Sequence, residues 1–559
     1  MGLGLSSRFT FGDTMYVNSI ADNAEFDYVV IGAGSSGCVM AAKLSGAGHS
    51  VLLLEAGGRD TSFNIKVPLF VAHVLNDENL IWPYMTEPQM HLNGQPQRWT
   101  RGRVIGGCSS INGNLFVRGD PQEYDNWRAA GCEGWGYNDM LPIFKRLEDF
   151  PEGDQSVRGS GGPIHCTPLT NFDPLSDAFL QACGEAGYKK PADYNDGNYE
   201  GAFYLQYSTR NGWRNSTPVG YLNPVLKRAN LTVLPNAIVT RLLLEGDQQK
   251  RATGAEYRLG DTPFKVKARR EVILSAGPLA SPKILELSGI GNSEVLQKFG
   301  IATQHHLPGV GENLRDHPNT RITYECAQPI TINDVLRSPW LKLKEGLRFM
   351  FKREGLLTIC SATAQMNYRS SDRVSQPDLV LRLLPLSGRD RYARTPDKGL
   401  DPHPGFTFGI TVLQPFSRGT VHLKSTDPLH QAAMDPKYLS HEADVQTFLD
   451  GMRVARKVAS QPGLKDLIVR ETRPGPEVND DAGLIDYMKG TIQTSWHMVG
   501  TCKMGVDDMA VVDPQLRVRG LAGLRVVDSS ICPSIPSSNT NIPSIAIGEK
   551  GADMVLAAG

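Results

Sequence analysis

The sequence lacks the long apolar runs and the charge imbalance that mark several common classes of protein. No run of about 18 apolar residues occurs, so no segment predicts a membrane-spanning helix. The first 26 residues contain neither a basic start nor an apolar stretch of signal-peptide length, which favours a soluble, cytoplasmic chain. With 58 basic and 59 acidic residues the charges nearly cancel, so we expect no nucleic-acid partner and a small-molecule ligand instead.

Cysteine is scarce and scattered. Nine cysteines, an odd number at irregular spacings, argue against a disulfide framework and for a reducing compartment. The clustered spacing of a zinc site is missing too, because Cys502 has no second cysteine near it, and we expect no metal site. What the chain has is length: 559 residues exceed what one hydrophobic core normally serves, which predicts at least two domains.

Residues 26–58, FDYVVIGAGSSGCVMAAKLSGAGHSVLLLEAGG, follow the order strand, glycine turn, helix, strand. Apolar runs at 28–31 and 51–54 predict buried parallel strands around a helix over 38–44. Glycines in the turn let the backbone approach a pyrophosphate, and Glu55, about 20 residues later, is placed to hold ribose hydroxyls. The motif predicts a dinucleotide site without distinguishing NAD from FAD. Its residues are Gly32, Gly34, Ser35, Ser36, Gly37, Glu55 and Ala56.

Two further glycine-rich stretches carry information about the ligand. Residues 102–119, GRVIGGCSSINGNLFVRG, combine glycines, small hydroxyls and asparagines in a segment that could thread past a ring system. Residues 277–291, GPLASPKILELSGIG, follow an apolar strand at 271–276 and begin a helix for which Ser281 is the expected cap. Taken singly, each stretch is equally compatible with an ordinary loop or strand-to-helix turn.

Together these two stretches resemble the signatures of the glucose-methanol-choline (GMC) oxidoreductases, a family of flavoenzymes. The second matches throughout; the first departs at Cys108, where Gly, Ser or Thr is usual and where cysteine occurs in members that act on choline. The likeness continues through 307–318 (LPGVGENLRDHP), 495–505 (SWHMVGTCKMG) and 511–555. It covers nearly the whole chain after residue 25.

The resemblance implies an α/β chain, α+β overall, in which a discontinuous Rossmann-like FAD-binding domain is joined by a substrate domain with an antiparallel sheet. The implied boundaries are 1–25 for an N-terminal extension, 26–165, 228–320 and 490–559 for the FAD-binding domain, and 166–227 and 321–489 for the substrate domain. In the substrate block, alternation over 406–425 predicts a strand pair, and 340–351 has the pattern of a basic amphipathic helix. For that helix a solvated face is favoured over peripheral contact with a membrane.

The resemblance also assigns cofactor residues. Asn112 stands where some relatives carry a histidine joined covalently to the flavin, so non-covalent FAD is expected. Residues 106–115 would line the isoalloxazine, Val239 would meet the adenine, and Asp528 would lie near the ribityl chain and pyrophosphate. For Trp82 and Val239, packing in the core is an equally good interpretation. The cofactor residues expected beyond the dinucleotide motif are Trp82, Gly106, Gly107, Asn112, Gly113, Asn114, Leu115, Val239, Ala276, Trp496, Asp528, Ser529 and Asn541.

His497 matches the histidine that the family places opposite the flavin N5, and Asn541, the second asparagine of the NTN triplet, matches its His or Asn partner. In the implied chemistry His497 accepts the alcohol proton, Asn541 holds the oxygen, and hydride passes to N5; a positioned base contributes ~10²- to 10⁴-fold. The expected function is therefore oxidation of a primary alcohol to the aldehyde. Trp496 hints at an aromatic substrate, although it is equally suited to packing on the flavin.

Three points stay open at this stage. The electrons could pass to a quinone-type acceptor or to O₂; Ser495, where some oxidases carry an apolar residue, slightly favours a dehydrogenase. A hydroxynitrile lyase with redox-silent FAD is the alternative on the same fold, less favoured because those relatives are secreted plant proteins. Four arginines in the substrate block could attract an acidic substrate, but a solvated loop is the favoured interpretation; they are Arg382, Arg389, Arg391 and Arg394.

Overall fold

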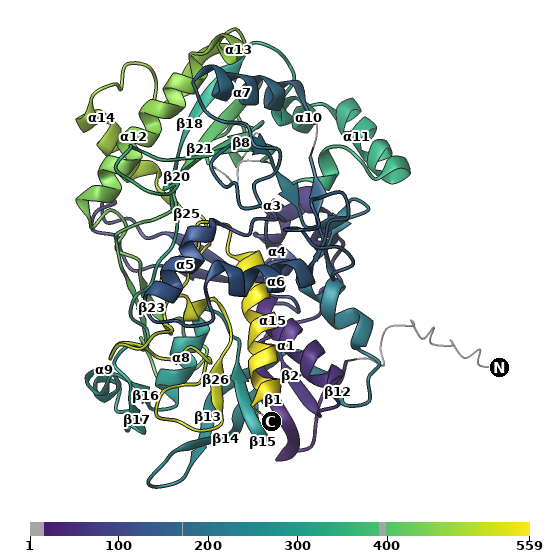
Figure 1. The fold of residues 1–559 in the computed structure, drawn as a ribbon, viewed down its shortest axis with the longest axis vertical. Helices are drawn as coiled ribbons and strands as arrows, with labels where there is room; N and C mark the ends of the chain where they lie inside the picture. Colours follow the sequence, from purple (N-terminus) through teal and green to yellow (C-terminus); the bar gives the residue numbers. More distant parts are fainter. Residues whose placement is uncertain (1–15, 170–171, 361, 391–397, 559) are drawn as a thin grey trace, which may run out of the picture.

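Two large sheets organise the molecule (Figure 1), whose computed structural model describes residues 16–169, 172–360, 362–390 and 398–558. The first sheet has the strand order β12-β2-β1-β15-β14-β13, with β26 also paired to β15. The second has the order β24-β18-β21-β20-β19-β8, with β25 beside β18. The predicted fold class, a Rossmann-like α/β unit plus a separate antiparallel sheet, is confirmed.

The first sheet is parallel on one side and antiparallel on the other. Its parallel strands are β1 (Ala24–Ile31), β2 (Val51–Leu54), β12 (Leu231–Leu234), β15 (Thr262–Leu274) and β26 (Leu524–Val526). Two antiparallel strands, β13 (Ala237–Glu245) and β14 (Arg251–Leu259), extend it beyond β15. The strands predicted at 28–31 and 51–54 are present and pair in parallel, as expected for apolar runs that are buried on both faces.

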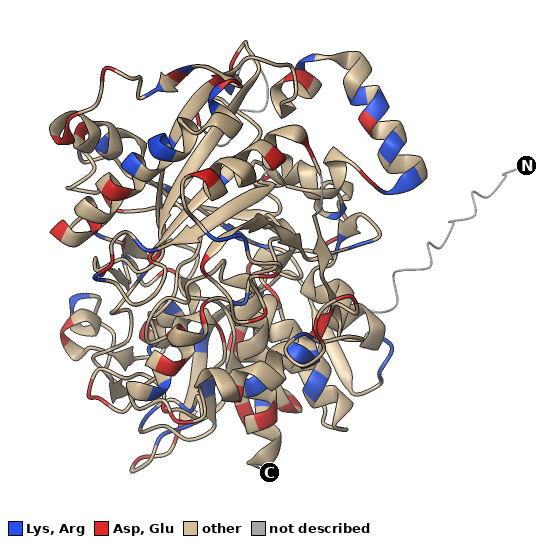
Figure 2. Ribbon diagram, turned by 45° about the horizontal axis from the view of Figure 1, so that its top comes forward, with Lys and Arg blue, Asp and Glu red and all other residues tan. Residues whose placement is uncertain are grey.

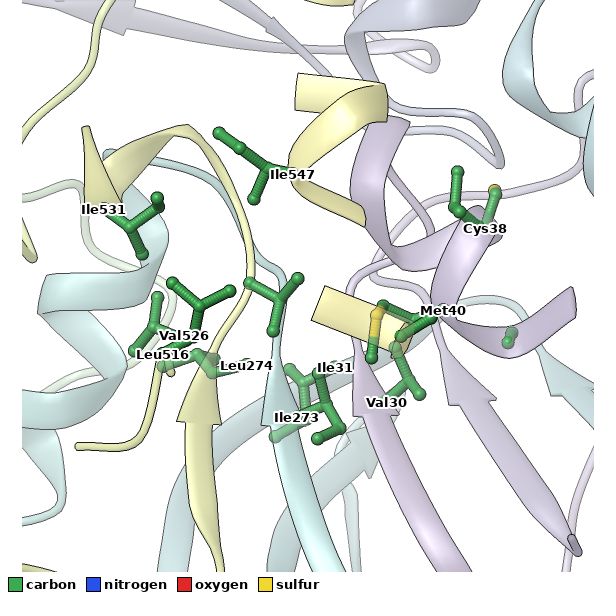
Figure 3. Close-up of a cluster of buried hydrophobic side chains, with 14 of the residues drawn as sticks. Val30, Ile31, Cys38, Met40, Ile273, Leu274, Leu516, Val526, Ile531 and Ile547 are labelled. Atoms are coloured by element: carbon green, nitrogen blue, oxygen red, sulfur yellow. The ribbon is translucent and has the colours of Figure 1, made fainter. Parts of the chain in front are cut away.

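Segments from both ends of the chain share the core of this sheet. Helices α1 (Ser35–Gly46) and α15 (Asn541–Ala557) pack against each other over it. Figure 3 shows the buried contacts: Val30 and Ile273 project from the sheet below Met40 of α1 and Ile547 of α15. Burying each such side chain contributes about 1.5–3 kcal/mol. Segments within residues 28–54 and 511–555 are therefore held in one core, and the unit around the sheet is discontinuous in sequence.

The second sheet is antiparallel and has two different faces. Its strands are β8 (Gly201–Tyr204), β18 (Pro318–Cys326), β19 (Ala364–Tyr368), β20 (Leu379–Leu384), β21 (Gly405–Val412), β24 (Ile468–Arg473) and β25 (Gln493–Thr494). Helices α7 (Pro174–Glu185) and α12 (Glu442–Ala459) contact its strands. On β21, Phe406 and Phe408 enter the apolar core, whereas Thr407 and Gly409 line a cavity. This alternation gives the sheet one packed face and one face that roofs the cavity.

The strand pair predicted over 406–425 is wrong in its pairing. Strand β21 pairs with β18 and β20, while β22 (Thr420–His422) pairs with β23 (Ala433–Asp435). The connection between β21 and β22 contains Pro415 and is too long for a tight hairpin turn, so each strand finds another partner. The implied domain boundary at residue 320 falls inside β18, and β25 pairs with β18 although 490–559 was assigned to the other domain.

Shorter elements connect the two sheets. The remaining helices are α2 (Phe63–Lys66), α3 (Val71–Val74), α4 (Cys108–Ile111), α5 (Pro121–Ala129), α6 (Tyr137–Leu147), α8 (Ala280–Leu287), α9 (Ser293–Lys298), α10 (Ile332–Arg337), α11 (Pro339–Lys352), α13 (Pro462–Lys465) and α14 (Asp481–Thr491). The remaining strands are β3 (Ile81–Met85), β4 (Arg98–Gly102), β5 (Glu148–Asp149), β6 (Ile164–His165), β7 (Thr167–Pro168), β9 (Gln206–Tyr207), β10 (Thr209–Arg210), β11 (Trp213–Arg214), β16 (Ile290–Gly291) and β17 (His305–His306). Within the described ranges, no helix combines the length and apolar character needed to cross a bilayer.

Candidate active site

The turn between β1 and α1 depends on two glycines, Gly32 and Gly37, at which a Cβ would clash with the backbone. Gly32 has φ +96°, and a Cβ there would lie 2.5 Å from the Ser275 carbonyl oxygen. A Cβ on Gly37 would lie 1.8 Å from the Gly32 carbonyl oxygen. Beside Gly34, by contrast, a Cβ would meet nothing within 4 Å, and no side chain caps the N-terminus of α1. The turn therefore leaves room for an anionic group at a helix N-terminus, where backbone N–H groups and the helix dipole stabilise negative charge.

Glu55 stands at the end of β2 and ties this turn to its neighbour. Its Oε2 accepts a hydrogen bond from Ala33 N at 2.9 Å, and its Oε1 accepts one from Gly57 N at 2.8 Å. Burial raises the pKa of the Glu55 carboxyl to about 7. Each oxygen keeps a second lone pair, so Glu55 can still accept from a ribose hydroxyl while it holds the two turns together.

Two cavities that share residues are lined by most of the cofactor and catalytic residues predicted from the sequence. The first, here called the nucleotide cavity, is lined by Gly32, Gly34, Ser35, Ser36, Glu55, Ala56, Trp82, Gly107, Val239, Ala276, Asp528 and Ser529, among others. The second, the sheet cavity, lies under the antiparallel sheet and is lined by Ser35, Asn112, Gly113, Asn114, Leu115, Trp496, His497, Ser529 and Asn541, among others. Because Ser35, Cys108 and Ser529 line both, the cavities adjoin.

Two of the predicted cofactor residues line neither cavity. Gly37 packs beneath the turn, against Gly32. Gly106 supports the turn from the other side, since its N–H donates to the Ala33 carbonyl at 2.7 Å. Both glycines shape the site through the backbone.

Asp528 joins the end of β26 to the turn that precedes α8. Its Oδ2 accepts from Gly277 N at 2.9 Å and from Ser281 Oγ at 2.6 Å, and its Oδ1 accepts from Ser530 N at 2.8 Å. The expected role of Ser281 as a helix cap is wrong: α8 begins at Ala280, and the Ser281 hydroxyl donates to the carboxylate instead. Asp528 thus fixes a wall of the nucleotide cavity.

The segment 106–115 forms a bed between the two cavities. Gly107 has φ +50°, and a Cβ there would lie 2.9 Å from the Gly34 Cα, so the two glycine-rich segments touch. Asn112 Oδ1 accepts from Asn114 N at 3.0 Å and from Arg214 Nη1 at 2.8 Å. Because the Asn112 oxygen is held twice, its Nδ2 is the amide atom available to a ligand. Nothing in the sequence pointed to Arg214, which comes from β11, about a hundred residues away.

The donor set of the adjoining cavities fits a flavin nucleotide. Asn114 Oδ1 and Thr100 Oγ1 are buried without a hydrogen-bond partner among the described residues, and both residues line the sheet cavity. Buried polar atoms in this state carry a cost that a bound ligand would remove. A ring system with polar edges in the sheet cavity and a pyrophosphate at α1 would satisfy both ends of the site.

The loop that carries His497 is anchored by a buried carboxylate. Asp316 Oδ1 accepts from His497 N at 2.8 Å, and Asp316 Oδ2 accepts from Thr494 Oγ1 at 2.5 Å. Burial raises the pKa of Asp316 above its usual range. The residue before the histidine, Trp496, has φ +60°, an unusual conformation for a bulky side chain that turns the chain sharply at this point. His497 itself is 9% exposed and lines the sheet cavity.

A chain of two hydrogen bonds fixes which nitrogen of His497 carries its proton. His317 Nε2 lies 3.0 Å from the Leu413 carbonyl, which can only accept, so Nε2 of His317 is protonated. Burial lowers the pKa of His317 to about 3, so the ring is neutral and its Nδ1 is an acceptor. His497 Nδ1, at 2.9 Å, must therefore donate to it. In neutral His497 the Nε2 atom is left with a lone pair.

Asn539, two residues before the expected Asn541, donates the hydrogen bond that the Nε2 lone pair accepts. Asn539 Nδ2 donates to His497 Nε2 at 2.9 Å, and Asn539 Oδ1 accepts from Arg382 Nη2 at 3.3 Å. Asn541 Oδ1 instead accepts from Ser35 Oγ at 2.9 Å. Asn541, the residue expected to act with His497, lines the same cavity: it is the first residue of α15 and its side chain meets the start of α1, whereas Asn539 lies in the loop beside His497.

The four arginines of the substrate block separate in the structure. Arg382 lines the sheet cavity, whereas the Arg389 side chain is 79% exposed. Arg391 and Arg394 lie outside the described residues. Ser495 lines the sheet cavity and donates its N–H to the His317 carbonyl at 3.0 Å.

A glycine-built dinucleotide cradle that adjoins a cavity lined by a histidine is typical of a flavin-dependent oxidoreductase. Comparison with known proteins narrows the class. The chain belongs to the GMC oxidoreductase family: the family's N-terminal model matches residues 26–319 and its C-terminal model matches residues 415–548. The resemblance inferred from the sequence motifs is confirmed, and FAD is the cofactor.

Curated relatives match over almost the whole chain. A protein from Vibrio vulnificus named oxygen-dependent choline dehydrogenase is 39% identical over 538 residues, which cover 95% of this chain and 94% of the relative. One of the same name from Pseudomonas savastanoi is 40% identical over 540 residues, with 95% and 94% covered.

Solved structures share the fold. Pyridoxine 4-oxidase from Mesorbium loti superposes with a TM-score of 0.84 at 28% identity, covering 94% of this chain and 98% of that protein. A formate oxidase variant from Aspergillus oryzae superposes with a TM-score of 0.89 at 25% identity, covering 96% and 99%.

Proposed function

We propose that this protein oxidises an alcohol to the aldehyde, with His497 as the base. The observation that carries the proposal is the hydrogen-bond chain from Leu413 through His317, which leaves His497 Nε2 as an acceptor facing the sheet cavity. Bound FAD supplies the hydride acceptor. His497 Nε2 takes the hydroxyl proton of the substrate, and a base so placed contributes ~10²- to 10⁴-fold.

Asn539 is proposed as the group that holds the substrate oxygen. Its Nδ2 now donates to His497 Nε2, the atom that a substrate hydroxyl would approach. When the hydroxyl occupies that position, the amide can donate to the alcohol oxygen and stabilise negative charge that develops there. Arg382 fixes which end of the amide faces His497, because it holds Asn539 Oδ1.

The remaining cofactor contacts follow from the cavity walls. We assign the pyrophosphate to the N-terminus of α1, the ribose to Glu55, and the ring to the bed at 106–115. Asn112 is an amide whose oxygen is already held by Arg214, so it offers no nucleophile for a covalent bond to the cofactor. FAD is therefore proposed to be dissociable.

The charged residues that line the sheet cavity indicate the charge of the substrate. Choline is a quaternary ammonium ion, and sites for such ions use aromatic faces or carboxylates. Among the described residues, this cavity has the aromatic residues Tyr207 and Trp496 in its lining, but its charged residues are the arginines Arg101, Arg321 and Arg382 against the single acid Asp390, so its net charge disfavours a cation. We therefore propose a neutral or anionic primary alcohol as the substrate, even though the curated relatives carry a choline dehydrogenase name. The acceptor is proposed to be a quinone or O₂.

Anaerobic spectroscopy tests the function directly. Addition of a primary alcohol to the holoprotein should bleach the oxidised flavin absorbance, whereas His497→Ala should bind FAD normally and bleach slower by ~10² or more. Near-native bleaching in the variant would refute the assignment of the base. Cleavage of a cyanohydrin without bleaching would instead indicate the lyase chemistry known on this fold.

A further inference from the structure

Helix α11 (Pro339–Lys352) stands at the edge of the molecule (Figure 1), and several of its large apolar side chains are exposed. Trp340 is 70% exposed and Phe351 is 77% exposed; Leu343, Leu347 and Met350 are exposed as well. Their spacing of three or four residues places them along one face of the helix. Soluble proteins seldom expose so contiguous an apolar stripe without a use for it.

The opposite face of α11 fastens the helix to the body of the protein. Phe349 is buried, with its ring centroid 4.9 Å from that of Trp213. Glu345 Oε2 accepts from Leu356 N at 2.9 Å, in the turn that follows. Ser338 caps the helix at its start by accepting from Leu341 N. The outward stripe is therefore held in place and is not the product of a loosely attached helix.

Cations surround this stripe. Between residues 337 and 354 there are six basic side chains and two acidic ones, although the whole chain is nearly neutral. The basic residues are Arg337, Lys342, Lys344, Arg348, Lys352 and Arg353. Figure 2 shows several blue segments on this helix, with one red segment among them. An apolar face with Trp, Leu and Phe bordered by Lys and Arg is the composition of a helix that lies in the interface of a bilayer.

We propose that α11 docks the protein on an anionic lipid surface, with Trp340, Leu347 and Phe351 inserted and the basic side chains among the headgroups. Charge decides between this occupant and a second copy of the chain: a symmetric contact would bring two sets of cations together, whereas an anionic bilayer neutralises them. The sequence alone favoured a solvated face for this helix; the exposure of its apolar side is what changes that interpretation.

Docking at α11 would place the sheet cavity near the bilayer. The chain runs from α11 through the turn η4 (Leu356–Thr358) to Cys360, which lines that cavity. An alcohol or acceptor dissolved in lipid would then have a short path to the site. Binding to the surface does not depend on the proposed function, because it can be measured without turnover.

Flotation of the full-length holoprotein with vesicles tests the proposal. Vesicles of phosphatidylcholine with about one third phosphatidylglycerol should carry the protein upward at low salt, and vesicles of phosphatidylcholine alone should carry at least tenfold less. The first variant removes the apolar stripe: Trp340→Ser, Leu347→Ser and Phe351→Ser together should lower partitioning at least tenfold. The second removes cations: Lys344→Gln, Arg348→Gln and Lys352→Gln together should lower it on the order of 100-fold, about fivefold for each charge.

Matched controls change the same residue types elsewhere on the surface. The apolar control combines Met90→Ser, Val469→Ser and Val506→Ser, all at exposed positions. The charge control combines Lys189→Gln, Lys190→Gln and Lys227→Gln. Both should float like the wild type, and all variants should retain FAD absorbance and alcohol-dependent bleaching. Wild-type protein that stays at the bottom, or controls that lose as much binding as the α11 variants, would overturn the proposal. A dimer in sedimentation that the apolar variant abolishes, without flotation, would make α11 a subunit interface instead.

Discussion

His317 Nδ1 and His497 Nδ1 lie 2.9 Å apart, with the two rings nearly perpendicular at 89°. Two like atoms can form this bond only if one is protonated and the other is not. The Leu413 carbonyl determines which ring donates. It can only accept a hydrogen bond, so the proton of neutral His317 lies on Nε2 and its Nδ1 accepts from His497. Residues about 180 positions apart thus determine that Nε2, and not Nδ1, is the acceptor nitrogen of neutral His497.

The first prediction concerns His317 as a positioning residue. His317→Leu removes the acceptor for His497 Nδ1, so the proton on His497 can move to Nε2 and the base is lost. We expect flavin reduction at saturating alcohol to slow by ~10², with FAD binding unchanged. His317→Gln can both donate to Leu413 and accept from His497, and should recover much of the rate. Stopped-flow reduction of both variants measures this; equal rates in Leu and Gln would show that His317 only fills space.

The second prediction separates the two asparagines of the NTN triplet. Asn539→Asp removes the Nδ2 donor at His497 and places a negative charge where an alkoxide develops, so flavin reduction should slow by ~10². Asn539→His keeps a donor and should retain more of the rate. Asn541→Asp places charge at the start of α1 beside Ser35, where it competes with the pyrophosphate.

For Asn541→Asp the expected loss is therefore in FAD affinity, measured by titration of the apoprotein, with a smaller effect on the reduction of the bound cofactor. If Asn541→Asp stopped reduction while Asn539→Asp left it intact, the sequence-based pairing of Asn541 with His497 would be restored.

Local patterns in the sequence were sufficient for the cradle but did not indicate the contact between Asn539 and His497. The turn after β1 is specified within about 30 residues, because each position where the backbone packs too closely for a side chain appears in the sequence as a glycine. The partner of His497 depends on where a loop passes in space, and the NTN triplet offers two equivalent amides two residues apart. Asn539 lies in the loop and Asn541 begins helix α15, so their side chains go in different directions: Asn539 reaches His497, and Asn541 reaches Ser35. Arg214 and Asp316 carried no local signal either, since each acts on a segment about a hundred or more residues away.

The third prediction is that FAD leaves the protein on denaturation. Acid precipitation should release all of the flavin absorbance into the supernatant, because the Asn112 amide cannot form a bond to the ring. Asn112→His would place a nucleophile at that position, beside Arg214. A yellow wild-type pellet, with a flavin-bearing peptide after digestion, would contradict the prediction.

The fourth prediction concerns the charge of the substrate. The holoprotein should be reduced at least tenfold faster by 4-(hydroxymethyl)benzoate or benzyl alcohol than by choline at equal concentration, because the cavity presents three arginines to the ligand. Arg382→Met also loosens Asn539, so its effect on any one substrate is ambiguous. The informative quantity is the rate of flavin reduction by 4-(hydroxymethyl)benzoate divided by the rate with benzyl alcohol. Both alcohols use Asn539, so a looser Asn539 affects both rates, and we expect the ratio to fall at least tenfold because the anion loses its cation.

Arg389→Met is the matched control, because the Arg389 side chain is 79% exposed. The ratio of its flavin-reduction rates with the anionic and the neutral alcohol should equal that of the wild type. Faster bleaching by choline than by either aromatic alcohol would refute the proposed substrate class.

The last prediction is a pH dependence of stability that arises away from the active site. His422, at the end of β22, lies between two carboxylates: its Nδ1 is 2.7 Å from Glu286 Oε1 and its Nε2 is 3.1 Å from Glu312 Oε1. Although burial alone would lower it, hydrogen bonds to these carboxylates raise the pKa of His422 from 6.5 to about 9. A pKa raised in the folded state means that the stabilisation is complete below pH 6.5 and is lost as the pH rises through 9.

At about 1.4 kcal/mol per unit, and with Glu312 partly exposed, the contribution is on the order of 2 kcal/mol at pH 6. His422→Gln should therefore melt well below the wild-type holoprotein at pH 6, and the gap should close by pH 10, where the wild-type imidazole is neutral as well. The exposed His430→Gln serves as the control and should show no gap at either pH. A gap between wild type and His422→Gln that stayed constant from pH 6 to pH 10 would mean that His422 contributes packing rather than charge, and the ion pairs with Glu286 and Glu312 would not stabilise the fold.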